Sequence, residues 1–333
     1  MRFGAVPLGD AAGALLAHSV KLPARRLKKG TALTDADVAD LRAAGLSEVI
    51  VARPEPGDLT ENEAAARLAA ALVPDAKAAG LRVTEPFTGR VNLIADGPGI
   101  VSLNRVALET FNRINPMITI ATVPEYQQMA AGGMVATIKI ISYALPEADV
   151  EAAAQAAPAA LRLLPPVFRK AGLVITNIPG GPDNTKGIRA TTDRVEALGL
   201  TLCDVREVAH DVSALASELS ALGGDLAMIL TGSATSDVED VAPAAVRAAG
   251  GKVDRFGMPV DPGNLLFIGS IGARPVIGLP GCARSPALNG TDWVLSRVAC
   301  GMPVTGDDIA AMGVGGLLKE IPTRPQPRAA RKR

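Results

Sequence analysis

The sequence predicts an α/β protein in which a C-terminal three-layer α/β domain with a mostly parallel sheet follows an α+β N-terminal region. The chain has 333 residues, more than a single hydrophobic core usually holds, so two domains are expected. Apolar residues make up 48% and charged residues 20% of the chain, which is typical of a folded globular protein. In the second half, strand-like segments alternate with short helical ones, and this alternation is typical of βαβ units.

The N-terminal region mixes helical and strand-like segments without that alternation. Residues 34–45 predict a helix, because Thr34 can cap its first turn and Gly45 can end it. The other expected elements are a strand at 47–52, an alanine-rich helix at 61–80, strands at 91–95, 117–123 and 134–145, and a helix at 147–161 interrupted by Pro158. The α+β assignment of this region follows from that mixture.

The second half is expected to alternate strand and helix: strand 171–178, helix 191–200, strand 201–208, helix 213–222 and strand 225–232. Ligands bind at the carboxyl ends of such strands, so chemistry is sought in the loops after Ile178, Leu230 and Leu279. The Leu-Leu-Pro-Pro run at 163–166 predicts the boundary between an N-terminal domain, 1–165, and a second domain, 166–320. The composition of residues 321–333, which is rich in Pro and Arg, predicts a tail or a linker.

The composition excludes several classes of function. Basic and acidic residues number 34 each, so no overall field favours a nucleic acid or an anionic membrane. Three cysteines without C-x-x-C spacing indicate a reducing cytoplasm rather than a disulfide framework. Two histidines exclude a three-histidine metal site, and His18 is expected to be a structural residue in an apolar stretch. No run of about 18 apolar residues occurs, so a soluble protein is expected.

The clearest candidate site follows the strand that ends at Leu230. Small and hydroxyl-bearing residues follow that strand directly, and acidic residues precede the next helix; the candidates are Thr231, Gly232, Ser233, Thr235, Ser236, Asp237 and Asp240. A strand, a small-residue turn and a helix N-terminus together form a cradle for an anion. Carboxylates beside a phosphate require a divalent cation between them, so Asp240 and Asp237 are candidate Mg²⁺ ligands. Helix capping by Ser236 or Asp240 explains the same pattern without a ligand.

Two further loops offer candidate ligand contacts. In 257–290, Gly263 and Gly281 allow close backbone approach, Arg284 supplies a positive charge and Ser285 a hydroxyl. The same residues also fit a hairpin followed by a helix that Ser285 caps, with Pro286 at its first position. The loop 177–192 offers Asn184 and Lys186, together with Asn177, Asp183 and Thr185, and its alternative is an exposed glycine-rich loop.

The order TGSATSDVEDVAP, DPGN and GLPGCARSP resembles the molybdopterin-binding domain shared by molybdopterin adenylyltransferases and molybdenum insertases. That domain carries a T-G-G-type turn, an Asp about nine positions later, a P-G-K-P turn and G-L-P-G-N-P-x-S. Residues 27–54 and 132–146 further resemble a divergent insertase-like branch. The resemblance implies that Asp240 is an essential acid, that Asp211 matches a second acid used in nucleotide chemistry, and that molybdopterin and Mg²⁺ bind this domain. Asp211 also fits a plain helix cap.

Departures from the family pattern bear on mechanism. Ser233 replaces the second turn glycine, Asp237 replaces another glycine, Asn264 replaces the lysine and Cys282 the asparagine. The resemblance implies Mg²⁺-dependent molybdate insertion or nucleotidyl transfer, with no histidine base in these loops. Loss of the lysine favours the alternative, a non-catalytic molybdopterin carrier or regulatory module for a cytidylyltransferase partner. Self-association is implied in both cases, and Cys282 is expected either to be buried or to contact the ligand.

Overall fold

The computed structural model describes residues 1–318, so the predicted tail at 321–333 lies outside the described residues. The chain forms two compact units. Among the described residues, unit 1 holds 1–96, 101–125 and 131–163, and unit 2 holds 97–100, 126–130 and 164–318. None of the helices within residues 1–318 is long and apolar enough to cross a membrane.

The first part of unit 1 is a small sheet with its own core. Strand β5 (Glu48–Arg53) lies between β1 (Arg2–Pro7) and β2 (Leu15–Leu16), and both pair with it antiparallel. Helix α1 (Asp35–Ala43) begins at the Thr34 capping box, as predicted. Buried Leu and Val side chains of 8–51 fill the core between these elements. The short elements η1 (Leu8–Asp10), β3 (Val20–Lys21) and β4 (Arg26–Leu27) complete this part.

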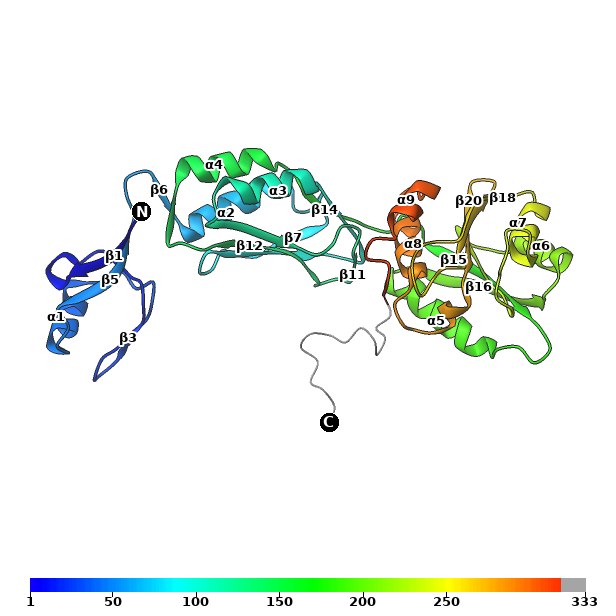
Figure 1. The fold of residues 1–333 in the computed structure, drawn as a ribbon, viewed down its shortest axis with the longest axis horizontal. Coiled ribbons are helices and arrows are strands. Elements are labelled where there is room, and N and C mark those ends of the chain that lie inside the picture. Colours follow the sequence, from blue (N-terminus) through cyan, green and yellow to red (C-terminus); the bar gives the residue numbers. More distant parts are fainter. Residues whose placement is uncertain (319–333) are drawn as a thin grey trace. The chain divides into compact units, whose positions relative to one another are not determined.

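The rest of unit 1 is an antiparallel sheet covered by helices. Its strand order is β10 (Ile118–Thr122), β12 (Met134–Ile140), β8 (Arg90–Ala95) and β7 (Leu81–Val83). Figure 1 shows α2 (Glu61–Leu72), α3 (Arg105–Ile114) and α4 (Glu147–Ala156) on one face of this sheet. Strand β6 (Asp58–Thr60) of this unit pairs with β13 (Ala144–Pro146). Strands β9 (Gly99–Leu103) and β14 (Leu161–Leu164) have residues in both units, and β11 (Gln128–Met129) lies in unit 2.

Three expectations for this region are corrected. The alanine-rich helix ends at Leu72 rather than at residue 80, because Val73 already leaves helical geometry and Pro74 follows. The expected strand 134–145 is two strands, β12 and β13, which belong to different sheets. Helix α4 ends at Ala156, before Pro158, so the proline follows the helix rather than interrupting it.

Unit 2 confirms the predicted three-layer α/β architecture with a mostly parallel sheet. The six strands run in the order β16 (Thr201–Ala209), β15 (Lys170–Asn177), β17 (Leu226–Leu230), β20 (Arg274–Leu279), β19 (Phe267–Ile271) and β18 (Lys252–Phe256). The pairs among β16, β15, β17 and β20 are parallel, whereas β19 is antiparallel to both of its neighbours.

Helices cover both faces of this sheet. One core packs the sheet against α5 (Asn184–Ala197), α8 (Gly290–Ala299) and α9 (Gly306–Ala311). The other core packs it against α6 (Val212–Ala221) and α7 (Val241–Ala248). Figure 1 shows α6 and α7 on one side of the sheet and α8 and α9 on the other. Helix α5 begins at Asn184, seven residues before the predicted start at 191, because Asp183 caps it with a hydrogen bond to Thr185 N–H.

In the antiparallel pair formed by β19 and β20, an aromatic ring packs over a glycine. Phe267 of β19 lies opposite Gly278 of β20 and is fully buried. A Cβ atom at Gly278 would lie 1.9 Å from the Phe267 ring. Residue 278 must therefore be glycine for Phe267 to fill this part of the core.

We expect Gly278→Ala to lower the free energy of unfolding by about 1–3 kcal/mol or more, because the added methyl group displaces a buried ring. Gly281→Ala is the control, since a Cβ atom at Gly281 meets nothing within 4 Å, and its effect should stay within about 0.5 kcal/mol. Denaturant unfolding measures both. Equal stability of the two variants would contradict this account of the core.

Candidate functional site

The carboxyl ends of the parallel strands meet at one edge of the unit 2 sheet. Helix α5, which follows β15, packs on one face, and α7, which follows β17, packs on the other. Since β15 and β17 are neighbours, the loops that leave them diverge to opposite faces. Open α/β sheets bind ligands in the crevice at such a switch point, so the carboxyl edge of this sheet is the candidate site. The segments after β15, β17 and β20 all reach this edge.

The turn after β17 is closed by its own hydroxyl groups. Thr231 Oγ1 donates to Ser233 O at 2.6 Å and lies 3.2 Å from Thr235 Oγ1. Thr231 and Thr235 are buried, whereas Ser233 and Ser236 are exposed. The two threonines therefore shape the turn, and the two serines remain accessible to a ligand.

Both carboxylate oxygens of Asp240 accept backbone N–H groups, and one of these N–H groups is at the start of α7. Oδ1 accepts the N–H of Val241 at 2.7 Å, and Oδ2 accepts the N–H of Ser236 at 3.0 Å. Partial burial acts to raise the pKa of this carboxyl, but those two N–H groups and the nearby His210 hold the pKa below its ordinary value. Asp240 therefore stays ionised at neutral pH.

The predicted Mg²⁺ ligands form no ready-made cage. Residues 1–318 contain no cluster of three His, Cys, Asp or Glu side chains arranged to hold a metal ion. Asp237 is exposed, and its Oδ1 accepts the N–H of Glu239 at 2.8 Å. Mg²⁺ commonly takes one or two protein carboxylates and completes its shell with water and phosphate oxygens. The donor set fits Mg²⁺ only together with such a ligand.

A hydrogen-bond chain joins the ends of three strands. The N–H of Gly232 donates to Thr176 Oγ1 at 2.8 Å, and the same oxygen lies 2.9 Å from His210 Nδ1. A Cβ atom at Gly232 would lie 2.7 Å from Thr176 O, so only glycine allows this approach. His210 directly follows β16 and lies outside the three loops in which the sequence predicted the chemistry. The neighbouring Asp211 caps α6 through the N–H of Ala214.

Arg284 bridges the loops that follow β15 and β17. Its guanidinium donates to Thr231 O at 3.0 Å, to Asn184 Oδ1 at 3.2 Å and to Asp183 O at 3.4 Å. Burial lowers the pKa of Arg284, and Asp183 only partly opposes this effect. None of the ion pairs within residues 1–318 includes Arg284. Its positive charge is therefore held by neutral oxygens at the crevice.

Asn184 and Lys186 both lie in the first turn of α5. Asn184 donates to Asn177 Oδ1 and to Glu207 Oε2, at 3.0 Å for the second bond, which ties the start of α5 to β16. Lys186 is exposed in the first turn of α5 rather than in a loop, which corrects the loop expected at 177–192.

Gly263 and Ser285 differ from their predicted roles. A Cβ atom at Gly263 would lie 2.8 Å from Gly290 N, so Gly263 packs against the start of α8 instead of leaving open backbone for a ligand. Ser285 does not cap a helix, because Asn289 caps α8, which begins at Gly290. Ser285 is exposed and its hydroxyl accepts the N–H of Ala287 at 3.2 Å.

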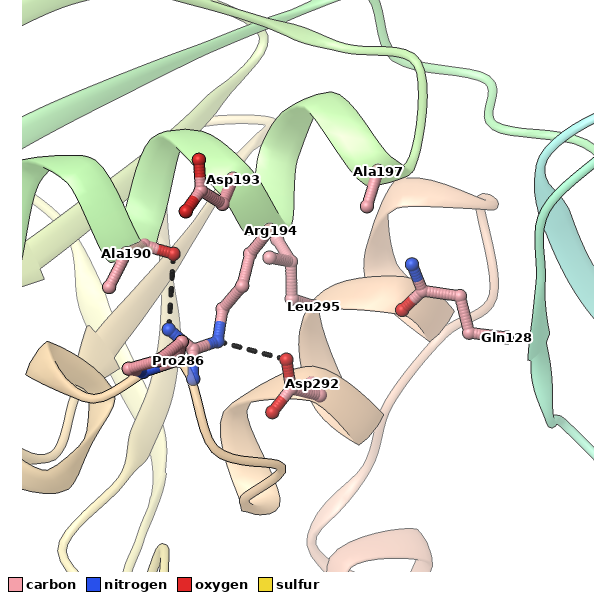
Figure 2. Close-up of a pocket in the computed structure, with 8 residues that line it drawn as sticks. All are labelled: Gln128, Ala190, Asp193, Arg194, Ala197, Pro286, Asp292 and Leu295. Carbon is pink, nitrogen blue, oxygen red and sulfur yellow. Dashed lines mark hydrogen bonds and ion pairs between the residues drawn. The ribbon is translucent and has the colours of Figure 1, made fainter.

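The sequence reasoning missed Arg194, which fixes the loop that carries Arg284. Arg194 is only 8% exposed and donates to Asp292 Oδ1 at 2.9 Å and to Ala283 O at 2.8 Å. Its other acceptors are the carbonyl oxygens of Ala190, Ser285 and Ala287. Figure 2 shows the guanidinium between α5 and α8, beside a cavity of about 170 Å³. A charged residue on the buried face of a predicted helix is the signal that could have identified it.

The comparisons with known proteins place only a small part of the chain in a family. Residues 5–53 match a family described as "Domain of unknown function (DUF8806)". No curated protein matches the chain.

Solved structures of two archaeal proteins are similar over most of the chain. A molybdopterin biosynthesis MoeA protein from Pyrococcus horikoshii is 15% identical, with 90% of this chain and 75% of that chain covered and a TM-score of 0.32. A molybdenum cofactor biosynthesis protein from Pyrococcus furiosus is 14% identical, with 91% and 66% covered and a TM-score of 0.24. Such TM-scores do not establish a shared fold, so the architecture rests on the strand order and packing given above.

We expect Thr176→Val to destabilise the protein by about 1–3 kcal/mol, because the buried N–H of Gly232 loses its acceptor. Thr176→Ser keeps the hydroxyl and should cost clearly less than the valine variant. Urea unfolding of the three proteins measures the difference. A valine variant as stable as the serine variant would show that this hydrogen bond does not hold the strand ends together.

The three cysteines should differ in reactivity. Cys203 is exposed, whereas Cys300 is 6% exposed and burial raises its pKa to about 11. At pH 8 about one Cys300 thiol in a thousand is then ionised, and this fraction rises with pH toward the pKa. Iodoacetamide labelling followed by peptide mass spectrometry should modify Cys203 first and Cys300 last. Rapid labelling of Cys300 at pH 8 in the folded protein would contradict its burial.

Proposed function

We propose that unit 2 binds the phosphate of a molybdopterin-type pterin at the switch-point crevice and acts in molybdenum cofactor biosynthesis. The observation that carries the proposal is the guanidinium of Arg284, which forms no ion pair within residues 1–318 and donates only to neutral oxygens. A guanidinium held by neutral oxygens at the carboxyl edge of a parallel sheet offers its charge to an anion. The sequence resemblance supplies the class of ligand.

The candidate residues divide into three groups by what they offer the ligand. Positive charge comes from Arg284 and from Lys186, and hydroxyl groups come from Ser233, Ser236 and Ser285. Asp240 and Asp237 would hold Mg²⁺ jointly with the phosphate oxygens. When bound, the cation would neutralise phosphate charge beside these carboxylates. Gly281, with open space around its Cα atom, lets the ligand approach the backbone.

Two roles fit this site, and one observation favours each. A transferase role, either Mg²⁺-dependent molybdate insertion or nucleotidyl transfer, is favoured by the ionised Asp240 at the crevice. A carrier role is favoured by the engagement of both Asp240 oxygens in hydrogen bonds to backbone N–H groups. We further propose that the chain associates with itself and with a cytidylyltransferase partner. We also propose that the boundary between its two functional domains, 1–165 and 166–320, lies between residues 165 and 166.

The first experiment measures pterin bound to the purified protein by mass spectrometry, and then the affinity of molybdopterin with Mg²⁺ present. Arg284→Gln should weaken binding about 10- to 100-fold, because a charge-assisted hydrogen bond is lost. Arg42→Gln, which removes an equivalent charge from an exposed position on α1, is the control and should bind as the wild-type protein does. If wild-type protein binds no pterin at micromolar concentration, the proposal is wrong.

Asp240→Asn separates the two roles. In the transferase role the substitution should abolish transfer of molybdenum or of a nucleotide, because the Mg²⁺ site loses a charge. In the carrier role the wild-type protein should bind pterin without turnover, and Asp240→Asn should leave that binding unchanged. Thermal unfolding of the variant controls for the lost helix cap, which is worth about 1 kcal/mol.

A further inference from the structure

His210 is the histidine that the fold brings to the candidate site. It follows β16, its backbone N–H donates to Asn177 O at 3.1 Å, and its side chain is partly buried. Its ring reaches Thr176, the residue that also holds Gly232. Through Thr176 the ring is therefore linked to the turn after β17, which carries the proposed phosphate site.

The hydrogen bonds of Thr176 determine which ring nitrogen of His210 carries the proton. Thr176 is fully buried, and its Oγ1 accepts the N–H of Gly232. Within residues 1–318, the other partner found for this hydroxyl is His210 Nδ1. If Nδ1 carried the proton, the hydroxyl hydrogen of Thr176 would be buried without an acceptor, which costs about 1–3 kcal/mol. The hydroxyl therefore donates to Nδ1, and the proton of the neutral ring lies on Nε2.

The geometry of the ring then directs the Nε2–H group outward. The two nitrogens of an imidazole point in widely different directions, and Nδ1 points toward the buried Thr176. Nε2 therefore points away from the sheet, and no residue within 1–318 has a hydrogen bond to it. A donor that is fixed in orientation and lacks a protein partner is suited to bind a ligand oxygen.

We propose that the Nε2–H group of His210 donates a hydrogen bond to a phosphate oxygen of the bound ligand, with Thr176 as the positioning residue. The identity of the ligand rests on the proposed function, whereas the orientation of the ring does not. A neutral donor adds a directed contact beside Asp240 and Asp211 without a formal charge of its own.

The first test reads the tautomer directly in the protein without ligand. Long-range ¹H–¹⁵N correlation spectra at pH 8.5 contain the signals of only two histidines, and a His18→Asn variant assigns them. We expect His210 to show the Nε2–H form alone. Thr176→Val should turn this signal into a mixture of both tautomers, and Thr176→Ser should keep the single form. An Nδ1–H form or an averaged mixture in the wild-type protein would overturn the proposal.

The second test uses inorganic phosphate with Mg²⁺ as the probe. The Nε2 signal of His210 should shift on titration, and that of His18 should not. His210→Gln places an amide N–H near the position of Nε2 and should retain affinity within about threefold. His210→Asn has no donor there and should weaken binding about tenfold, the effect of one lost hydrogen bond to a charged group. His18→Asn is the control for both variants.

The outcomes separate this proposal from the proposed function. If phosphate and molybdopterin do not bind the wild-type protein, the proposed function and the ligand contact of His210 both fail, although the tautomer result stands. If they bind while the Nε2 signal stays fixed and His210→Asn binds normally, the role of His210 is wrong and the proposed function stands. Thermal unfolding confirms in each case that the variants are folded.

Discussion

The hydrogen bond from Gly232 N–H to Thr176 Oγ1, 2.8 Å long, joins the ends of β15 and β17, and the candidate site depends on it. The parallel ladder between these strands ends at the pair Ile175 and Leu230, and this hydrogen bond connects the residues that follow the pair. The close approach needs a residue without a side chain at 232, because a Cβ atom would lie 2.7 Å from Thr176 O. Thr176 thereby contacts both the turn after β17 and the ring of His210.

Two arginines complete the edge of the sheet, and their partners distinguish their roles. Arg194 is buried and makes hydrogen bonds to four carbonyl oxygens and to Asp292, so its donors are used within the protein. A buried guanidinium so fully satisfied stabilises the local structure and has little left for a ligand. Arg284 lies on the loop that Arg194 fixes, and its guanidinium donates hydrogen bonds only to neutral oxygens. Arg194 therefore fixes the conformation of the loop, and Arg284 supplies its positive charge.

The sequence predicted the fold class because the alternation of strands and helices in the second half is a local pattern. It also located the turn after β17 and the cap at Asp240, since strand ends and helix caps depend on residues close together in the chain. It could not locate Arg194 or the contact of Thr176 with His210, because their partners lie 98 and 34 positions away. The start of α5 was missed because glycine and proline before Asp183 gave the segment the composition of a loop. The sequence predicted Ser285 as a helix cap, whereas Asn289 caps α8, because either residue fits the local pattern.

The acidic residues at this edge place a physical constraint on any ligand. Asp183, Asp211, Asp237 and Asp240 each accept a backbone N–H at a helix start or turn. Such hydrogen bonds stabilise the ionised carboxylate, and the pKa of Asp183 is held low by the N–H and side chain of Thr185. Asp183 and Asp240, whose pKa values are both held low, therefore stay negative and repel a free phosphate. A phosphorylated ligand can bind here only where Arg284, a neutral donor or a shared cation offsets that charge, because the chain as a whole, with 34 basic and 34 acidic residues, supplies no attractive field.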